Sequence, residues 1–131
     1  MILVRVAQIR NIKGVMGRRN MKTLKFRHNL VQKILDGSKT VTWRLFDDKN
    51  LQVGDKIEFI DWESGGKFAD AEIIGAREKK LGDIEEKDFE GHEKYGSNEE
   101  MLEHYKKYYG EKVNMDTMVK IINFKLLRAS Q

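Results

Sequence analysis

The segment from Asp36 to Arg44, DGSKTVTWR, places a lysine and two threonines close together in the chain. A threonine hydroxyl is a weak nucleophile unless a base takes its proton, and a lysine whose pKa is lowered by partial burial can act as that base. Lys39 follows a glycine turn and need not obey strand alternation, so its amine can reach Thr42. A carboxylate from elsewhere in the chain would complete such a site by passing a proton to a leaving amine.

The same segment also fits a purely structural interpretation. In a regular strand Thr40, Thr42 and Arg44 lie on one face, while Val41 and Trp43 point to the other. We expect Val41 and Trp43 to pack in the core, which leaves the polar face open to solvent or to a cleft. A solvated sheet face is therefore the alternative to a reactive site.

Short elements around this segment must position it. Residues 23–27, TLKFR, alternate apolar and charged side chains as a half-buried strand does. A helix of about two turns should follow from Leu30, with Asn29 as its N-cap. Gly37 should end this helix in a left-handed conformation.

The rest of the chain predicts a hairpin, two helices and a closing strand. Residues 56–62 and 67–76 read as two strands joined by a Ser-Gly-Gly turn, and residues 118–127 are rich in strand-forming side chains. Two helix starts fit reciprocal capping, and these are Asp83 with Glu86 and Ser97 with Glu100. The second helix carries an apolar and aromatic stripe that we interpret as core, consisting of Met101, Leu102, Tyr105 and Tyr109.

These elements predict one α+β domain over residues 21–131. The expected architecture is a small β-barrel of about five or six strands with peripheral helices. Residues 1–20 carry five basic residues and no acidic residue, and they lack clean helical or strand patterning. We expect this segment to be a disordered extension or a non-native start, with a basic nucleic-acid arm as the alternative.

Composition limits the function further. The chain has no cysteine, and its three histidines lack the spacing of a helical metal pair, so we expect neither a metal nor another cofactor. No apolar run approaches the roughly 18 residues that span a bilayer, and we expect a cytoplasmic protein without a membrane partner. Because the chain has a net charge of +4 and residues 1–20 carry +5, the remaining residues carry −1. That balance favours a small ligand over a long RNA footprint.

Local charge nevertheless allows for a nucleic-acid partner. Residues 22–56 contain eight basic and four acidic residues, whereas the stretch from Glu63 to Glu103 is acidic. We therefore expect a basic cleft rim beside an acidic helical flank.

The segment ILDGSKTVTWR, followed closely by LQVGDKIEF, resembles the signature of the ASCH domain family. The resemblance extends over nearly all of Met21 to Leu127 and leaves residues 1–20 unmatched. It implies a PUA-like barrel with a central cleft that binds RNA or nucleotide-like ligands. Some small bacterial members hydrolyse N4-acetylcytidine to cytidine and acetate.

The resemblance also implies roles for particular residues. The lysine base of those hydrolases corresponds to Lys39, and their nucleophilic threonine corresponds to Thr42. Their carboxylate falls within EGHEKYGSNEEM, where Glu93 is the first choice and Glu90 the second. The chain departs from those hydrolases in two ways. It is longer than they are, and it has Trp43 where they usually have a smaller aliphatic residue.

Other polar and aromatic residues near this motif have two open interpretations. Arg44 is suited to bind an anion or a carbonyl group, or to form a surface ion pair with Asp47 or Asp48. Trp62 stands beside the Ser-Gly-Gly turn and is either the edge of the core or a platform for a ligand. Thr40 shares the polar face and is a further candidate ligand contact.

Three functions remain open from the sequence. The first is a module that binds RNA or a modified nucleoside in a polar cleft. The second is an N4-acetylcytidine amidohydrolase that cleaves an amide C–N bond with Lys39, Thr42 and Glu93. The third is a scaffold that binds a protein partner and retains a vestigial pocket.

Overall fold

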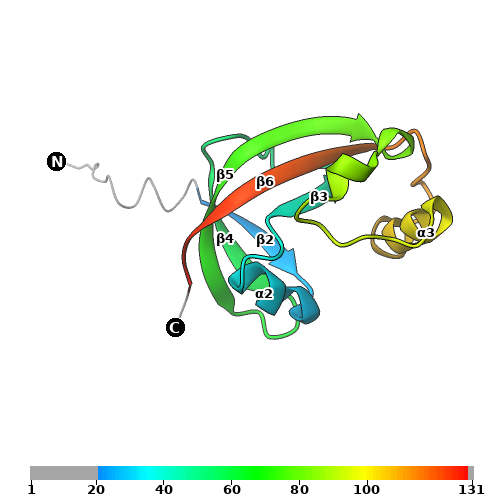
Figure 1. Ribbon diagram of the computed structural model, residues 1–131. Helices are drawn as coiled ribbons and strands as arrows, with labels where there is room; N and C mark the ends of the chain where they lie inside the picture. Colours follow the sequence, from blue (N-terminus) through cyan, green and yellow to red (C-terminus); the bar gives the residue numbers. More distant parts are fainter. Residues whose placement is uncertain (1–20, 130–131) are drawn as a thin grey trace.

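A single five-stranded sheet forms the body of the molecule and curls into a half-barrel (Figure 1). The computed structural model describes residues 21–129. The strand order across the sheet is β2-β4-β5-β6-β3, with β2 parallel to β4 and every other neighbouring pair antiparallel. The strands are β2 (Lys22–Phe26), β3 (Val41–Leu45), β4 (Lys56–Asp61), β5 (Lys67–Lys80) and β6 (Met118–Ala129). The α+β prediction with five or six strands is therefore confirmed, whereas the predictions for residues 1–20 lie outside the described residues.

Helix α2 (His28–Leu35) follows β2 directly and begins earlier than predicted. Its N-cap is Arg27, so the prediction that Asn29 caps the helix was wrong. The reason is a tertiary contact, because the backbone N–H of His28 donates to the carboxylate of Glu63 at 3.0 Å. That distant acid satisfies an amide at the helix end that a local cap would otherwise serve. Gly37 ends the helix with φ +87°, as predicted.

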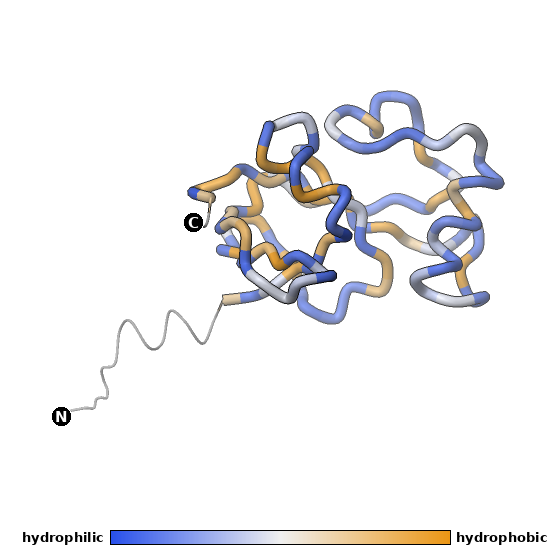
Figure 2. Tube along the Cα trace, turned by 90° about the horizontal axis from the view of Figure 1, so that it is seen from below, coloured by the Kyte–Doolittle hydropathy of each residue, from blue (hydrophilic) through white to orange (hydrophobic). Residues whose placement is uncertain are grey.

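Strands β4 and β5 form the predicted hairpin, whose turn contains Gly65 at φ +77°. Strand β5 is longer than the sequence predicted, since it continues through Lys80, and it pairs with β6 from Ala69 to Lys80. The colouring by hydropathy in Figure 2 shows hydrophobic and hydrophilic stretches alternating along the chain. The hydrophobic core packs along the whole of this long β5–β6 ribbon, at both of its ends.

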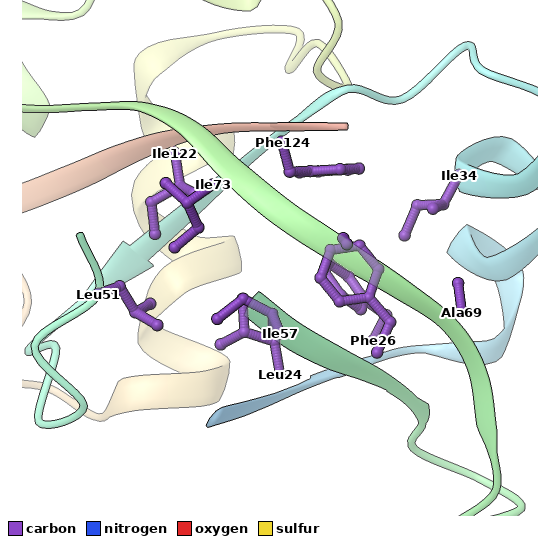
Figure 3. Close-up of a cluster of buried hydrophobic side chains, with 11 residues drawn as sticks. Leu24, Phe26, Ile34, Leu51, Ile57, Ala69, Ile73, Ile122 and Phe124 are labelled. Atoms are coloured by element: carbon purple, nitrogen blue, oxygen red, sulfur yellow. The ribbon is translucent and has the colours of Figure 1, made fainter. Parts of the chain in front are cut away.

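The core consists of two clusters on the two halves of this ribbon. In the first cluster, Leu24 and Phe26 of β2 meet Ile34 of α2 and Phe124 of β6, as Figure 3 shows. The second cluster is built on the other side of β6 from Val119 and Ile121, together with side chains of β3 and α3. The strand predicted for residues 118–127 thus serves both clusters, because each face of β6 is buried over part of its length.

The segment that joins β5 to α3 differs from the sequence prediction. Asp83 and Glu86 do not start an α-helix, and the structure has two short 3-10 turns, η1 (Leu81–Asp83) and η2 (Glu86–Phe89). Glu85 and Asp88 form the reciprocal cap, which lies two residues further along the chain. The second predicted start is confirmed, because the Ser97 hydroxyl accepts from the Glu100 N–H at 3.1 Å and begins α3 (Asn98–Tyr109). Within residues 21–129, no helix is long and apolar enough to cross a membrane.

Asp88 fastens this segment to the sheet. Its side chain is fully buried and accepts hydrogen bonds from Arg77 Nη2 at 2.6 Å, Lys79 Nζ at 2.8 Å and the Glu85 N–H at 2.7 Å. Burial alone would raise the pKa of Asp88, but these hydrogen bonds and charges outweigh it and lower the pKa to about 2. The carboxylate therefore holds η2 against β5 and orients the residues that follow it.

We expect Asp88→Asn to lower the free energy of unfolding at pH 7 by about 2 kcal/mol, because a depressed carboxyl pKa is a stability contribution. That contribution is present above the ordinary pKa of an aspartate and is lost as the pH falls through the folded value. In urea titrations, the difference in the free energy of unfolding between Asp88→Asn and the parent should therefore become smaller as the pH falls from about 4 to about 2. Asp116→Asn, at an exposed position, is the control, and a difference that is constant with pH would contradict the account.

Candidate functional site

A cavity of about 290 Å³ lies where the two edge strands of the half-barrel, β2 and β3, approach each other. Its walls come from both edge strands, the start of α2, the turn after β4, the segment before α3, and α3 itself. Five of the seven site residues predicted from the sequence line it, and these are Lys39, Thr42, Arg44, Trp62 and Glu93. The fold therefore gathers distant segments of the chain around one cavity.

Arg44 bridges the opening between the edge strands β2 and β3, which we call the seam of the half-barrel. Its Nη2 donates to the backbone oxygen of Lys25 on β2 at 3.0 Å, and its Nε donates to Thr42 Oγ1 at 3.2 Å. The guanidinium also lies 4.8 Å from the centre of the Phe26 ring. Arg44 thus joins β3 to β2 where no backbone ladder joins them, and it orients the hydroxyl of Thr42.

Of the two roles predicted for Arg44, the surface ion pair with Asp47 or Asp48 was wrong. Asp47 instead accepts a hydrogen bond from Lys120 Nζ at 2.8 Å. The other role, binding to a carbonyl group, is filled within the protein by the oxygen of Lys25. The sequence could not show this, because β2 and β3 are brought together only by the curl of the sheet.

Lys39 lies at the bottom of the cavity with a side chain that is 3% exposed. Its Nζ donates to Glu93 Oε2 at 2.6 Å and to the backbone oxygen of Val41 at 2.8 Å. The turn at Gly37 directs it inward, and its own N–H is bonded to the oxygen of Lys33 in α2. Burial lowers the pKa of Lys39, and the charge of Glu93 offsets part of that effect.

Glu93 is the carboxylate that the structure brings to Lys39. Burial acts to raise the pKa of Glu93, but the charge of Lys39 and the hydrogen bond from Lys39 outweigh it, so the net pKa is lowered. The lowered pKa keeps Glu93 a carboxylate at neutral pH, facing the amine of Lys39. Glu90, the second choice from the sequence, is exposed and lies outside the cavity.

Thr42 is buried beside this pair, but its hydroxyl is not bonded to the lysine. Among the described residues, Thr42 Oγ1 accepts from Arg44 and has no hydrogen bond with Lys39. An ammonium group has three N–H donors, and Lys39 uses two of them on Glu93 and Val41. One lysine donor and the Thr42 O–H donor thus remain for a ligand.

An aromatic wall faces these polar groups. Trp43 is 3% exposed, which confirms the prediction that it packs in the core, and its ring stacks on His92 with the ring centres 4.1 Å apart. Burial and the charge of Lys39 lower the pKa of His92 to about 4, so this imidazole is neutral at pH 7. Tyr105 of α3 packs on the other side of Trp43, at 6.3 Å between ring centres.

Sequence reasoning missed the part that α3 plays in the cavity. The stripe on α3 was interpreted as core, and Met101 and Tyr105 are indeed buried. Tyr105 and Tyr109 also line the cavity, together with Tyr108 from the adjoining exposed face. The helical spacing could have indicated only that these residues share a face, because the cavity exists only once α3 lies against β3.

The remaining predicted contacts lie at or beyond the mouth of the cavity. Trp62 lines the mouth and is 52% exposed, so it is not part of the core. Thr40 is exposed, and its N–H donates to the oxygen of Gly91 at 3.0 Å, which places it outside the cavity. In the described part of the chain, no group of three or more histidine, cysteine, aspartate or glutamate side chains could hold a metal ion.

No protein-family model and no curated protein matches this sequence. Solved structures do match its fold. The ASCH domain from Lactobacillus crispatus JV V101 has a TM-score of 0.65 at 15% identity, covering 95% of this chain and 90% of that chain. ASCH from Zymomonas mobilis has a TM-score of 0.60 at 10% identity, covering 85% and 73%. Protein PF0455 from Pyrococcus furiosus has a TM-score of 0.59 at 23% identity, covering 82% and 98%.

These similarities define the class of fold. The chain has an ASCH-like α+β fold, a curled five-stranded sheet with helices at its periphery, as the motif in residues 34–44 predicted. The identities are low, so the likeness concerns the fold. The site must be interpreted from its own residues.

Gly91 offers a test of how Glu93 is positioned. A Cβ at Gly91 would clash with Thr40 Oγ1, and φ there is +78°. Gly65 has a matching φ of +77° with open space around it. We expect Gly91→Ala to cost at least about 1 kcal/mol more in the free energy of unfolding than Gly65→Ala, because a clash adds to the same backbone strain. Equal costs in urea titrations would contradict the close approach.

Glu93 and Glu90 provide a second matched pair. Glu93→Gln leaves the buried amine of Lys39 without its counter-charge, so the free energy of unfolding should fall by about 3 to 5 kcal/mol at pH 7. Glu90→Gln should change it by less than about 0.5 kcal/mol. Because a buried amine with a lowered pKa gains stability as the pH rises, the deficit of Glu93→Gln should shrink toward pH 10. Equal effects of the two substitutions would show that Lys39 does not depend on Glu93.

Proposed function

We propose that this chain binds RNA or a modified nucleoside, with one nucleoside seated in the cavity between β2 and β3. The observation that carries the proposal is the buried Lys39, paired with Glu93 at 2.6 Å in a cavity of about 290 Å³ that is also lined by aromatic side chains. That volume is at the lower end of the range for small-molecule sites, roughly 300 to 1,000 Å³, and suits a single nucleoside. We propose that it does so in the cytoplasm.

The polar groups suit the edge of a nucleobase. Glu93 can accept a hydrogen bond from an exocyclic amino group, as carboxylates do with the N4 amino group of cytosine. The free N–H of Lys39 and the hydroxyl of Thr42 can donate to ring nitrogens or carbonyl oxygens. Tyr108 and Tyr109, which also line the cavity and are less buried, supply rings on which an unpaired base can stack.

A second candidate function is the hydrolysis of N4-acetylcytidine, which the shared position of Lys39, Thr42 and Glu93 on one cavity favours. In this reaction the Thr42 oxygen would attack the acetamide carbonyl while Lys39 takes the hydroxyl proton, and Glu93 would help to protonate the departing amine. Water would then hydrolyse the threonine ester and release acetate. Transfer of one proton from Lys39 to Glu93 would supply the neutral amine and the carboxylic acid that these steps need.

The observed hydrogen bonds favour binding over turnover. Lys39 is held by Glu93 and Val41, and the Thr42 hydroxyl is held by Arg44. Turnover would require the lysine amine and the Thr42 hydroxyl to form a hydrogen bond of about 3 Å once substrate is bound. Binding needs no such rearrangement.

A panel of nucleosides tests the proposal. We expect N4-acetylcytidine or one of the four ordinary nucleosides to bind in calorimetric titrations, and Lys39→Met, Thr42→Val and Glu93→Gln each to weaken binding about tenfold or more. Glu90→Gln and Thr40→Val are matched controls outside the cavity and should bind as the parent does. Circular dichroism of each variant separates lost binding from lost folding.

The same samples separate the candidate functions. Release of cytidine and acetate from N4-acetylcytidine, abolished by Lys39→Met and Thr42→Val, would establish the hydrolase. Binding without product would establish the binding module. If neither nucleosides nor RNA bind at millimolar concentration, the proposal is wrong, and a scaffold with a vestigial pocket is the remaining interpretation.

A further inference from the structure

At the mouth of the cavity, the positively charged side chain of Arg27 lies near two aromatic rings. The guanidinium of Arg27 lies 5.6 Å from the centre of the Trp62 ring and 5.8 Å from that of the Tyr108 ring. Lys25 Nζ lies 6.0 Å from the Trp62 ring. Trp62 follows β4 and Tyr108 belongs to α3, so Arg27 spans the opening between elements on its two sides.

These cations have no acidic partner within residues 21–129, although acids lie nearby. Lys25 and Arg27 are exposed and form no ion pair there. The two nearby acids are already engaged: Asp61 accepts from His28 Nδ1 at 2.7 Å, and Glu63 accepts from the His28 N–H. Two positive charges therefore remain available at the mouth for an anion.

Trp62 forms a fixed and accessible platform beside them. Its backbone N–H donates to the oxygen of Phe26 at 2.8 Å, which ties the residue to the end of β2. The turn behind it is held by Asp61, whose Oδ1 accepts from the N–H of Glu63 at 2.9 Å. The side chain is 52% exposed, an unusual position for a large aromatic residue in a chain with only two tryptophans.

We propose that Lys25, Arg27 and Trp62 form a second subsite, at the mouth of the cavity, that binds the phosphate and the adjacent base of a single-stranded RNA. This inference rests on the proposed function, and it deepens it by naming the ligand as a nucleotide within a strand. The cavity has room for one nucleoside, so the strand that carries it must leave through the mouth. There its backbone meets Lys25 and Arg27, and the next base stacks on the indole of Trp62.

The charge of the protein favours contact with only a short stretch of RNA. Outside residues 1–20 the chain carries a net charge of −1, so a long phosphate track has little to attract it. Two cations at the mouth neutralise about two phosphates, which predicts a slope of log affinity against log salt of about −1.4 for a single strand. Each lysine or arginine removed should reduce the slope by about 0.7.

Fluorescence anisotropy of labelled, random-sequence RNA hexamers tests this subsite in the full chain. Binding should weaken about tenfold in Trp62→Ala, and the salt slope should be reduced in Lys25→Gln and Arg27→Gln. Lys67→Gln, on β5 and outside the cavity lining, is the control and should bind as the parent does. A double-stranded RNA of the same length, whose bases are paired and stacked, should compete weakly.

Nucleoside binding, measured beside hexamer binding, distinguishes the two proposals. If the subsite exists, Trp62→Ala and Arg27→Gln reduce hexamer affinity by a clearly larger factor than nucleoside affinity. If nucleosides bind and hexamers bind no more tightly, or the mouth variants leave hexamer affinity unchanged, the subsite is overturned and the cavity proposal stands. If neither nucleosides nor hexamers bind, the proposed function fails, and the subsite fails with it.

Discussion

The site depends on one electrostatic constraint, the burial of the Lys39 ammonium. A buried charge that loses its partner destabilises a protein by several kcal/mol, so the fold must supply Glu93 and must hold it at hydrogen-bonding distance. Two glycines with positive φ make this possible, Gly37 by turning the chain inward after α2 and Gly91 by allowing the approach to Thr40. Asp88 then anchors the segment that carries Glu93 to the sheet.

The second feature that shapes the site is the open seam of the half-barrel. Edge strands present unpaired backbone groups, which natural sheets cover or occupy. Here the side chain of Arg44 crosses from β3 to the oxygen of Lys25, and the cavity lies beside this bridge. The same guanidinium also orients the hydroxyl of Thr42, so one side chain both joins the two edge strands and positions this hydroxyl.

Sequence reasoning reached the features that local chemistry determines. The strands, the turn at Gly37 and the Ser97 cap follow from alternation, backbone freedom and capping within a few residues, and the structure confirms them. The predictions failed where residues distant in the sequence determine the contacts. Glu63 takes the place of the helix cap expected from Asn29. The backbone oxygen of Lys25 takes the place of the acidic partner expected for Arg44. The pairing of Lys39 with Glu93 spans 54 residues, and spacing alone could not separate Glu93 from Glu90.

The central claim is that the cavity between β2 and β3 holds a nucleoside, and the chain has a built-in reporter for it. Its two tryptophans, Trp43 and Trp62, both line that cavity. In ¹H–¹⁵N spectra recorded during a titration with cytidine and with N4-acetylcytidine, both indole signals and the amides of Thr42 and Glu93 should shift with one common affinity. Amides of the distant turn at Asn114 and Asp116 should stay in place. Shifts confined to residues outside the cavity, or no shifts with either nucleoside at millimolar concentration, would contradict the claim.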